Sequence, residues 1–314
     1  MKKIKKVTLC GLGAIGAFFA DRLREDSDIV FSVLAGGERA DRLREKGLII
    51  NGRQKYFNIV SPEEKTSFSD LIIISTKFSG LKNALEDIKN NVGKDTLIIA
   101  PLNGVESEDA VASVYGFERT IYSLVRVSSV KNSNKVSFDP ETSFVEFGER
   151  INDPSNPSEN VSAIKALFDH AKIKSVIQPD MQKAIWEKFV CNVSENQVSA
   201  VLDIPFGAWG SSKSADQLRL MVADEGISVA EKKGISIDRD YPRRHLEFLK
   251  KVPVENKSST LQDILAGRKT EKDIFSGAMI RLGRETGVPT PLNEFIYHAL
   301  TVLEEKNDGK IMGI

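Results

Sequence analysis

The chain has 314 residues, in which 44 lysines and arginines balance 44 aspartates and glutamates. This length allows two domains with a substantial core. A net charge of zero gives no global signal for nucleic acid or for a membrane surface, although a local cationic pocket can exist within a balanced total. The two cysteines, Cys10 and Cys191, form no C-x-x-C or histidine-rich ligand set, so we expect reduced core thiols and no metal site.

The first residues are not expected to form a targeting or membrane segment. Residues 1–6 are rich in lysine, but the apolar run behind them is short and ends at Gly11, with Asp21 and Arg22 soon after. This pattern fits neither a secretory signal peptide nor a membrane span. We therefore expect a soluble, cytoplasmic protein.

The apolar run at 7–10 leads directly into G-x-G-x-x-G at residues 11–16. A strand that passes through this spacing into a helix, here at 17–24, is typical of dinucleotide binding. Gly11 permits the tight turn, Gly13 lets a pyrophosphate approach the backbone, and Gly16 lets the helix pack on the strand. The helix N-terminus offers free N–H groups to phosphates. The residues predicted to hold the cofactor here are Gly11, Leu12, Gly13, Ala14, Ile15 and Gly16. The alternative is an ordinary glycine-rich turn.

The first half of the chain alternates strands with helices. Further strands are expected at 29–34, 71–75 and 96–100, with helices at 39–46 and 81–90. Such alternation predicts a parallel sheet covered by helices. Between 120 and 148 the pattern changes, and 121–130, 135–138 and 144–147 are expected to be antiparallel strands.

Strand patterns largely stop after residue 180. Helices are expected at 181–202, 217–233, 241–249, 271–286 and 291–306. The sequence therefore predicts an α/β protein with a Rossmann-like dinucleotide-binding domain at 1–179 and an all-helical substrate-binding domain at 180–314.

The second strand bears on the choice of nicotinamide cofactor. NAD sites of this type usually place an acid at its tip, but this strand ends in Leu34, Ala35 and Gly36. Arg39 could instead pair with a 2′-phosphate, which favours NADPH. The alternatives are that Arg39 is merely solvated in the first turn of a helix, or that Glu38 turns toward a ribose.

Lys188, Asn192 and Asn196 recur every four residues and so share one helical face. Their neighbours are apolar, which suggests a cleft rather than open water. A lysine and two carboxamides suit recognition of a polarised carbonyl, and desolvation makes a lysine a better proton donor near neutrality. The alternative is the wet side of an ordinary amphipathic helix.

A second polar set comprises Asn256, Ser259 and Asp263, followed by Glu271. Thr270 is expected to cap a helix, with Glu271 in its first turn. The pattern leaves open whether Glu271 serves only the helix start or also projects into a cleft.

The chain resembles the ketopantoate reductase (2-dehydropantoate 2-reductase) family along most of its length. The matching pieces are the glycine motif with its strand, STK at 75–77, LNGV at 102–105, WEK at 186–188 with Asn192 and Asn196, NKSSTLQD at 256–263, TE at 270–271 and GVPTP at 287–291.

The resemblance implies a Rossmann-like domain and a helical domain with the active site between them, NADP(H) as cofactor, and reduction of 2-dehydropantoate to pantoate on the way to pantothenate and coenzyme A. It implies that Lys188 is the general acid and that Glu271 binds the substrate hydroxyl. The residues implied to line the cofactor and substrate pocket are Lys77, near the nicotinamide, and Asn103, Asn192, Asn196, Asn256 and Ser259.

Two departures from the family leave the ligands open. Gly36 stands where members commonly carry arginine for the 2′-phosphate, and residues 274–277 read IFSG where the family often has YING. The alternatives are a reductase of another small 2-oxo acid or a non-catalytic nicotinamide-binding sensor. The expected partner is a small 2-oxo acid, without nucleic acid or membrane, and the oligomeric state is open, a homodimer being one option.

Overall fold

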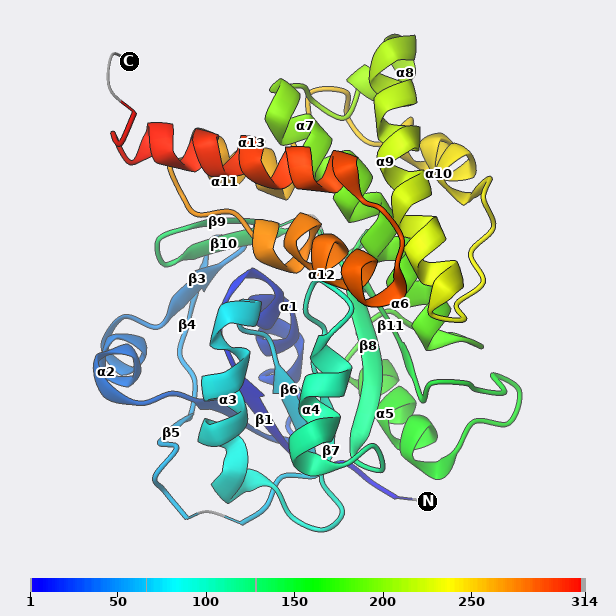
Figure 1. Ribbon diagram of the computed structural model, residues 1–314. Coiled ribbons are helices and arrows are strands. Elements are labelled where there is room, and N and C mark those ends of the chain that lie inside the picture. Colours follow the sequence, from blue (N-terminus) through cyan, green and yellow to red (C-terminus); the bar gives the residue numbers. More distant parts are fainter. Residues whose placement is uncertain (1, 66, 128, 312–314) are drawn as a thin grey trace. The chain divides into compact units, whose positions relative to one another are not determined.

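The computed structural model describes residues 2–65, 67–127 and 129–311. The chain divides into two compact units, Met1–Gln182 and Lys183–Ile314, and the boundary falls within one helix, α6 (Met181–Cys191). Each unit is described by itself (Figure 1).

An eight-stranded sheet forms the centre of the N-terminal unit. Its order is β12-β11-β8-β7-β6-β1-β2-β5. The strands are β1 (Lys6–Cys10), β2 (Val30–Leu34), β5 (Ile59–Val60), β6 (Leu71–Ile74), β7 (Leu97–Ile99), β8 (Thr120–Arg126), β11 (Phe144–Gly148) and β12 (Ser175–Ile177). Six consecutive strands from β5 to β8 are parallel, while β11 runs antiparallel to β8. The order of these six is that of a doubly wound dinucleotide-binding sheet, with its switch point between β1 and β6.

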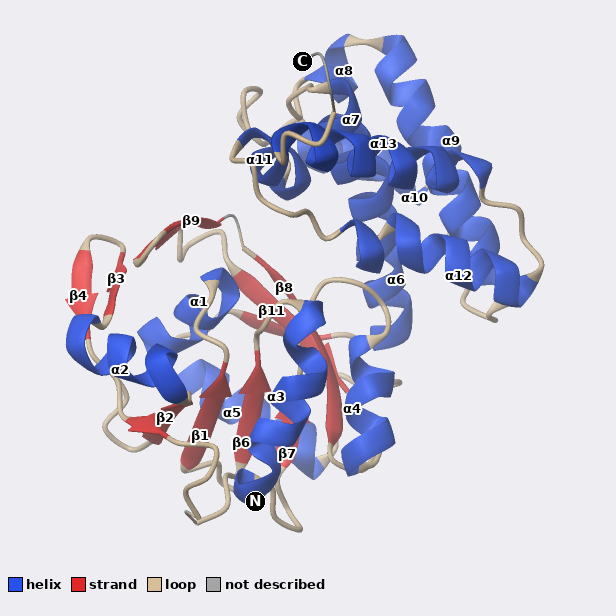
Figure 2. Cartoon of the chain, turned by 60° about the vertical axis from the view of Figure 1, so that its left-hand side comes forward, coloured by secondary structure: helices blue, strands red, loops and turns tan. Residues whose placement is uncertain are grey.

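Helices cover both faces of this sheet. They are α1 (Ala14–Leu23), α2 (Gly37–Lys46), α3 (Leu81–Asp87), α4 (Ser107–Tyr115) and α5 (Glu159–His170), with 3₁₀ turns at Phe78–Gly80 and Ile88–Asn91. Alternate residues of β1 and β6 point to opposite faces: Leu9 and Ile73 pack with α1 and α5, and Ile72 and Ile74 pack with α3 and α4. Figure 2 shows α3 and α4 lying across one face. The predicted Rossmann-like architecture is confirmed.

A small second sheet has the order β4-β3-β10-β9. It comprises β3 (Leu48–Ile50), β4 (Arg53–Lys55), β9 (Ser129–Asn132) and β10 (Lys135–Phe138). The prediction of one strand at 121–130 was wrong. Residues 120–126 pair with β7 and β11 in the large sheet, whereas 129–132 pair with β10 in the small one; residue 128 of the predicted strand lies outside the described residues.

The C-terminal unit consists of helices, as predicted (Figure 2). After α6 come a π-helical segment (Asn192–Gln197), α7 (Val198–Leu202), α8 (Ala208–Ser211), α9 (Lys213–Lys232), α10 (Tyr241–Leu249), α11 (Ser259–Leu265), a 3₁₀ turn (Lys272–Ile274), α12 (Ser276–Thr286) and α13 (Pro291–Asn307).

Two predicted helices of this unit differ in detail from the structure. The helix expected at 271–286 is broken at Phe275, whose φ of −107° and ψ of −97° lie outside the helical range. The ring of Phe275 is buried and stacks on Phe189 with centroids 6.3 Å apart, so tertiary packing accounts for the break. The helix expected at 181–202 is continuous but widens into the π-helical segment.

Within the described ranges, no helix combines the length and the hydropathy needed to cross a membrane.

Candidate functional site

The turn between β1 and α1 lies at the switch point of the large sheet. Gly11 has φ of +102°, and a Cβ there would come within 2.7 Å of the Ser75 carbonyl carbon. The Ser75 hydroxyl donates to the Gly11 carbonyl oxygen at 2.5 Å, which holds the ends of β1 and β6 together. A Cβ at Gly16 would overlap that same carbonyl oxygen. Only glycine therefore fits at positions 11 and 16.

Gly13 is different, because the protein does not fill the space beside it. The nearest atom that its Cβ would meet is the Ser75 carbonyl oxygen at 3.7 Å, an ordinary contact. Its backbone, with φ of −90°, is open to any residue. The protein itself therefore does not require glycine at 13, and the free space beside the backbone is what a bound pyrophosphate needs.

A cavity of about 570 Å³ opens beside this turn. It is lined by the carboxyl ends of β1, β2 and β6 and by α3, and its lining includes Gly11, Gly13, Gly36, Arg39 and Lys77. Its volume lies in the range of small-ligand sites. The structure therefore brings the glycine turn, Arg39 and Lys77 around one hollow at the edge of the sheet where ligands of such folds bind.

Asn103 lies in the loop between β7 and α4, half-buried. Because β7 is parallel to β6, this loop leaves the sheet at the same edge as the glycine turn. Asn103 is not part of the cavity lining.

In the C-terminal unit, the three residues of the polar stripe fall on neighbouring helical segments. Lys188 is in the last turn of α6, and Asn192 and Asn196 begin and continue the π-helical segment. The Asn196 amide donates to the Asn192 side-chain oxygen at 3.1 Å, so the two carboxamides lie together. All three side chains are half-buried. The π-helical turn is a feature that often marks functional sites.

A buried ionic cluster supports this segment from within. The Glu195 carboxylate accepts from Arg219 at 3.2 Å and contacts the His245 ring at 3.0 Å. The Arg219 side chain is fully buried and also bonds Asp216 and the Pro242 carbonyl oxygen. Sequence spacing did not single out these residues, since they come together only through packing. Cys191, Glu195 and His245 lie close enough to one another to suggest a metal site. However, the cationic Arg219 already binds the Glu195 carboxylate.

The second polar set is only partly assembled by α11. Asn256 precedes the helix and is half-buried, while Ser259 begins it and is exposed. The neighbouring Ser258 is buried, caps α11 by accepting from Leu261, and donates to the Asn196 carbonyl oxygen at 3.0 Å. Ser258 thus connects α11 to the π-helical segment. The sequence signal for this cap is a serine three residues before the apolar Leu261 of the helix.

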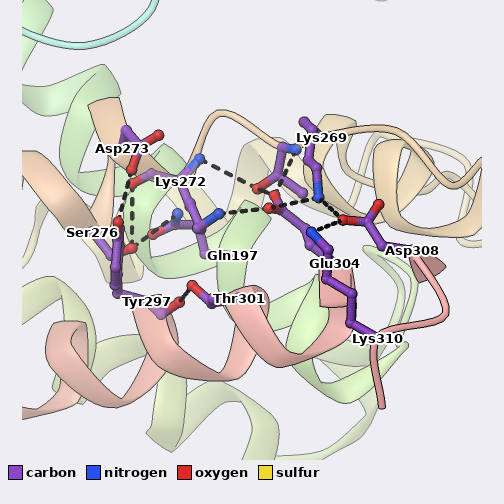
Figure 3. Close-up of polar contacts among 11 residues, drawn as sticks. Gln197, Lys269, Lys272, Asp273, Ser276, Tyr297, Thr301, Glu304, Asp308 and Lys310 are labelled. Carbon is purple, nitrogen blue, oxygen red and sulfur yellow. Dashed lines mark hydrogen bonds and ion pairs between the residues drawn. The ribbon is translucent and has the colours of Figure 1, made fainter. Parts of the chain in front are cut away.

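Glu271 is half-buried and directly precedes the 3₁₀ turn, and the residues on both sides of it are held by Glu304 of α13. The Glu304 carboxylate accepts from the Thr270 amide at 2.9 Å, from its hydroxyl at 2.7 Å, and from Lys272 at 2.6 Å. Figure 3 shows Glu304 between Lys272 and the pair of Lys269 and Asp308. The predicted Thr270 cap is corrected: Glu271, not Thr270, occupies the position before the 3₁₀ turn, and the Thr270 oxygen makes only a long contact of 3.4 Å with the Lys272 amide.

The pKa of Glu304 reflects this setting. Burial raises it, but the bonds from Lys272 and Thr270 lower it more, so that the net shift is downward. Tyr297, seven residues before Glu304 on α13, donates to Asp273 at 2.9 Å. The segment around Glu271 is therefore fastened to α13 at 270, 272 and 273.

Two family models match the chain in order. "Ketopantoate reductase PanE/ApbA" matches residues 7–150, and "Ketopantoate reductase PanE/ApbA C terminal" matches residues 180–304. The chain belongs to the ketopantoate reductase family. It is accordingly an oxidoreductase.

Known members and folds agree with this membership. A 2-dehydropantoate 2-reductase of Aquifex aeolicus is 28% identical over 93% of this chain and 95% of that protein. The solved D-mandelate dehydrogenase with NADH and anilino(oxo)acetate superposes with a TM-score of 0.85 at 23% identity, covering 96% of this chain and 99% of that one. A dimeric ketopantoate reductase from Staphylococcus aureus gives 0.78 at 20% identity, covering 96% and 99%.

The cofactor of the ketopantoate reductase family, NADP(H), fits the N-terminal unit. Gly13 leaves room where a Cβ would stand, and the cavity beside it carries the cations Arg39 and Lys77. Both cysteines are free and buried, as predicted, and burial raises the pKa of the Cys10 thiol to about 12.

Proposed function

We propose that the protein reduces 2-dehydropantoate to pantoate with NADPH, a step toward pantothenate and coenzyme A. The observation that carries this proposal is the ordered match of both family models, over residues 7–150 and 180–304. The glycine turn and its cavity support a dinucleotide in the first region. Lys188, Asn192 and Asn196, on consecutive helical segments, support a polar substrate in the second region.

The chemistry assigns a role to each group. When bound, the nicotinamide supplies the hydride that adds to the ketone carbon. The carbon–oxygen double bond then becomes a single bond and negative charge develops on the oxygen. Lys188 stabilises that charge and donates a proton to the oxygen, giving the alcohol. Asn192 and Asn196 hold the substituents of the carbonyl, and Glu271 accepts a hydrogen bond from the substrate hydroxyl.

The remaining assignments follow the same plan. Residues 11–16, Arg39, Lys77 and Asn103 are proposed to hold the cofactor, and Asn103, Asn256 and Ser259 to contact the substrate. We also propose that residues 1–179 bind the dinucleotide, that residues 180–314 bind the 2-oxo acid, and that the protein is a cytoplasmic homodimer. The dimeric state of the Staphylococcus aureus relative supports the last point.

A second candidate is a reductase of another small 2-oxo acid. The segment that departs from the family pattern favours it, because Phe275 is buried against Phe189 and Ser276 is buried against Gln197. These side chains shape the region after Glu271 differently from a Tyr-Ile-Asn sequence. The solved mandelate dehydrogenase shows that this fold also serves other 2-oxo acid and 2-hydroxy acid pairs.

A substrate panel separates the candidates. Steady-state rates with 2-dehydropantoate, pyruvate, 2-oxoisovalerate and phenylglyoxylate, each with NADPH and with NADH, give kcat/KM for every pair. We expect 2-dehydropantoate with NADPH to be the best pair. A higher kcat/KM for another 2-oxo acid would favour the second candidate, and no turnover with any would indicate a sensor.

Lys188→Ala tests the assigned proton donor. We expect kcat to fall by roughly 10²–10⁴-fold, the usual contribution of a positioned acid, while NADPH binding is retained. Circular dichroism and an NADPH titration check that the variant is folded and loaded. Near-normal turnover in such a protein would remove Lys188 from the mechanism.

A further inference from the structure

Gly36, just after β2, lines the cavity without offering a side chain, and cations gather nearby. Arg39 lines the cavity, and Arg42 follows it by three residues on α2, so the two lie on one helical face. Both side chains are exposed. Since α2 follows β2, this face lies near the strand end where the adenosine ribose binds in such folds.

A third cation reaches this region from the β9–β10 hairpin. The Lys131 ammonium donates to the carbonyl oxygen of Leu12 in the glycine turn, at 3.4 Å. Lys131 is far from the glycine turn in sequence, so this contact exists only through the tertiary fold. It brings a side chain of the small sheet to the edge of the cofactor turn.

The position of the hairpin is set by packing. Lys131 pairs with Val136 across the ladder, and directly opposed residues point to the same face. Val136 and Phe138 lie on that face, both buried, and the Phe138 ring packs edge-on against Phe18 of α1 at 5.7 Å. Since α1 begins directly after the glycine turn, the contact that fixes the hairpin also fixes Lys131 above Leu12. Lys135, paired with Asn132, points to the opposite face.

The charges of Arg39 and Arg42 act on Lys131. The Lys131 side chain is exposed, but desolvation by the protein around it lowers its pKa, and the nearby charges of Arg39 and Arg42 lower it further. Among the residues that the structure describes, no carboxylate makes an ion pair with any of the three. Two acids lie near the arginines: Asp87 of α3, whose pKa burial raises and Arg39 lowers, and the exposed Glu38, which directly precedes Arg39 on α2. Three neighbouring cations without an ion-paired carboxylate favour an anionic ligand.

We propose that Lys131, together with Arg39 and Arg42, binds the 2′-phosphate of the adenosine ribose and takes over the role of the arginine absent at position 36. The site is a phosphate clamp formed by α2 and the β9–β10 hairpin. This inference rests on the proposed cofactor and names the residues that select it. It adds to Arg39 a residue from outside the strand–turn–helix motif.

Binding titrations of the intact protein test the clamp without turnover. NADPH and NADH are titrated by fluorescence, and adenosine 2′,5′-bisphosphate and adenosine 5′-monophosphate by calorimetry, because the members of each pair differ by the 2′-phosphate. For Lys131→Ala we expect the Kd of NADPH and of the bisphosphate to rise about tenfold or more, since one charge-assisted hydrogen bond is lost. The Kd of NADH and of the monophosphate should change by less than about twofold.

The matched control is Lys135→Ala, which removes the same charge from the other face of the same hairpin and should leave all four constants unchanged. Lys131→Gln keeps the length of the side chain and should behave like the alanine variant. Equal weakening of NADPH and NADH, or no change in either, would overturn the clamp. A protein that keeps this binding pattern yet reduces no 2-oxo acid would instead refute the proposed function alone.

Discussion

At the scale of single residues, the most unusual ionisable group of the N-terminal unit is Glu108 in the first turn of α4. Its side chain is fully buried, accepts from the Ser107 hydroxyl at 2.8 Å, and faces the Ser123 amide at 3.4 Å. Burial raises the pKa of Glu108 to about 7, against the bonds that lower it. The ionised carboxylate is thus less favourable in the folded protein than in the unfolded chain.

This shift predicts a loss of stability as pH rises. The folded state keeps the proton of Glu108 up to about pH 7, whereas the unfolded chain releases it near 4.5. Between these values the native state binds more protons, so the free energy of unfolding falls with pH, by roughly 3 kcal/mol at most. Below pH 4.5 this contribution is fully present.

Glu108→Gln tests the shift, because the amide is isosteric and does not ionise. We expect the variant to match the wild type near pH 5 and to be more stable at pH 8, by about 1–3 kcal/mol. Denaturant unfolding at both pH values measures the difference. An equal offset at the two pH values would show that the carboxylate does not titrate as proposed.

Gly13→Val separates the needs of the fold from those of the cofactor. The backbone at 13 suits any residue and the nearest atom to a Cβ is 3.7 Å away, so the unfolding temperature should change little. NADPH binding should weaken severely, since the branched side chain occupies the space of the pyrophosphate. Thermal unfolding and an NADPH titration give the two readings. Unchanged binding would reject the phosphate turn.

At the scale of elements, α13 is the support of the segment that carries Glu271. Glu304 and Tyr297 of this helix bind residues 270, 272 and 273, and the Glu304 side chain is only 5% exposed. These bonds connect segments that are 24 to 34 residues apart in sequence. They fix the backbone on both sides of Glu271.

Glu304→Ala should therefore act through position rather than chemistry. We expect KM for the 2-oxo acid to rise about tenfold, with KM for NADPH unchanged, because three bonds to residues 270 and 272 are lost. Glu304→Gln keeps an acceptor for Thr270 and should recover part of the effect. Asp308→Ala is the matched control, since the described partners of the Asp308 side chain are Lys269 and Lys310 and such surface pairs contribute little. An equal rise in KM for the 2-oxo acid in Glu304→Ala and Asp308→Ala would mean that Glu304 has no positioning role.

At the scale of the whole molecule, two compact units meet within α6. The glycine turn and its cavity belong entirely to the first, while Lys188, the asparagine pair and Glu271 belong to the second. A ligand that binds one folded unit stabilises it by mass action, by about 2.7 kcal/mol at a hundredfold excess over Kd.

Hydrogen exchange with and without NADPH tests which unit binds the dinucleotide and which binds the 2-oxo acid. We expect NADPH alone to slow exchange at the carboxyl ends of β1, β2 and β6, in residues 10–16, 34–39 and 74–80, because these segments line the cavity. A 2-oxo acid added to the NADPH complex should extend protection to residues 188–196 and 270–272. Protection by NADPH confined to residues 183–314 would contradict the assignment of the dinucleotide to the first unit.

Local patterns in the sequence were sufficient to predict much of the fold and part of the candidate site. The glycine motif, the alternation of strands and helices, and the helical second half depend on hydrophobic period and turn chemistry, which act over a few residues. The spacing of Asn192 and Asn196 likewise predicted that their side chains meet, because residues four apart are neighbours on a helix.

Other features were decided only by tertiary structure. The strand expected at 121–130 is divided because each half finds a different partner strand, and pairing across a sheet is not encoded locally. The helix expected at 271–286 breaks because burial of Phe275 outweighs helix propensity. Three further contacts join segments that are distant in sequence: Lys131 with Leu12, Glu304 with the residues on both sides of Glu271, and Arg219 with Glu195 of the π-helical segment. Their free energy comes from hydrogen bonds and ion pairs that offset the cost of desolvating the groups, and the partners meet only once the chain has folded.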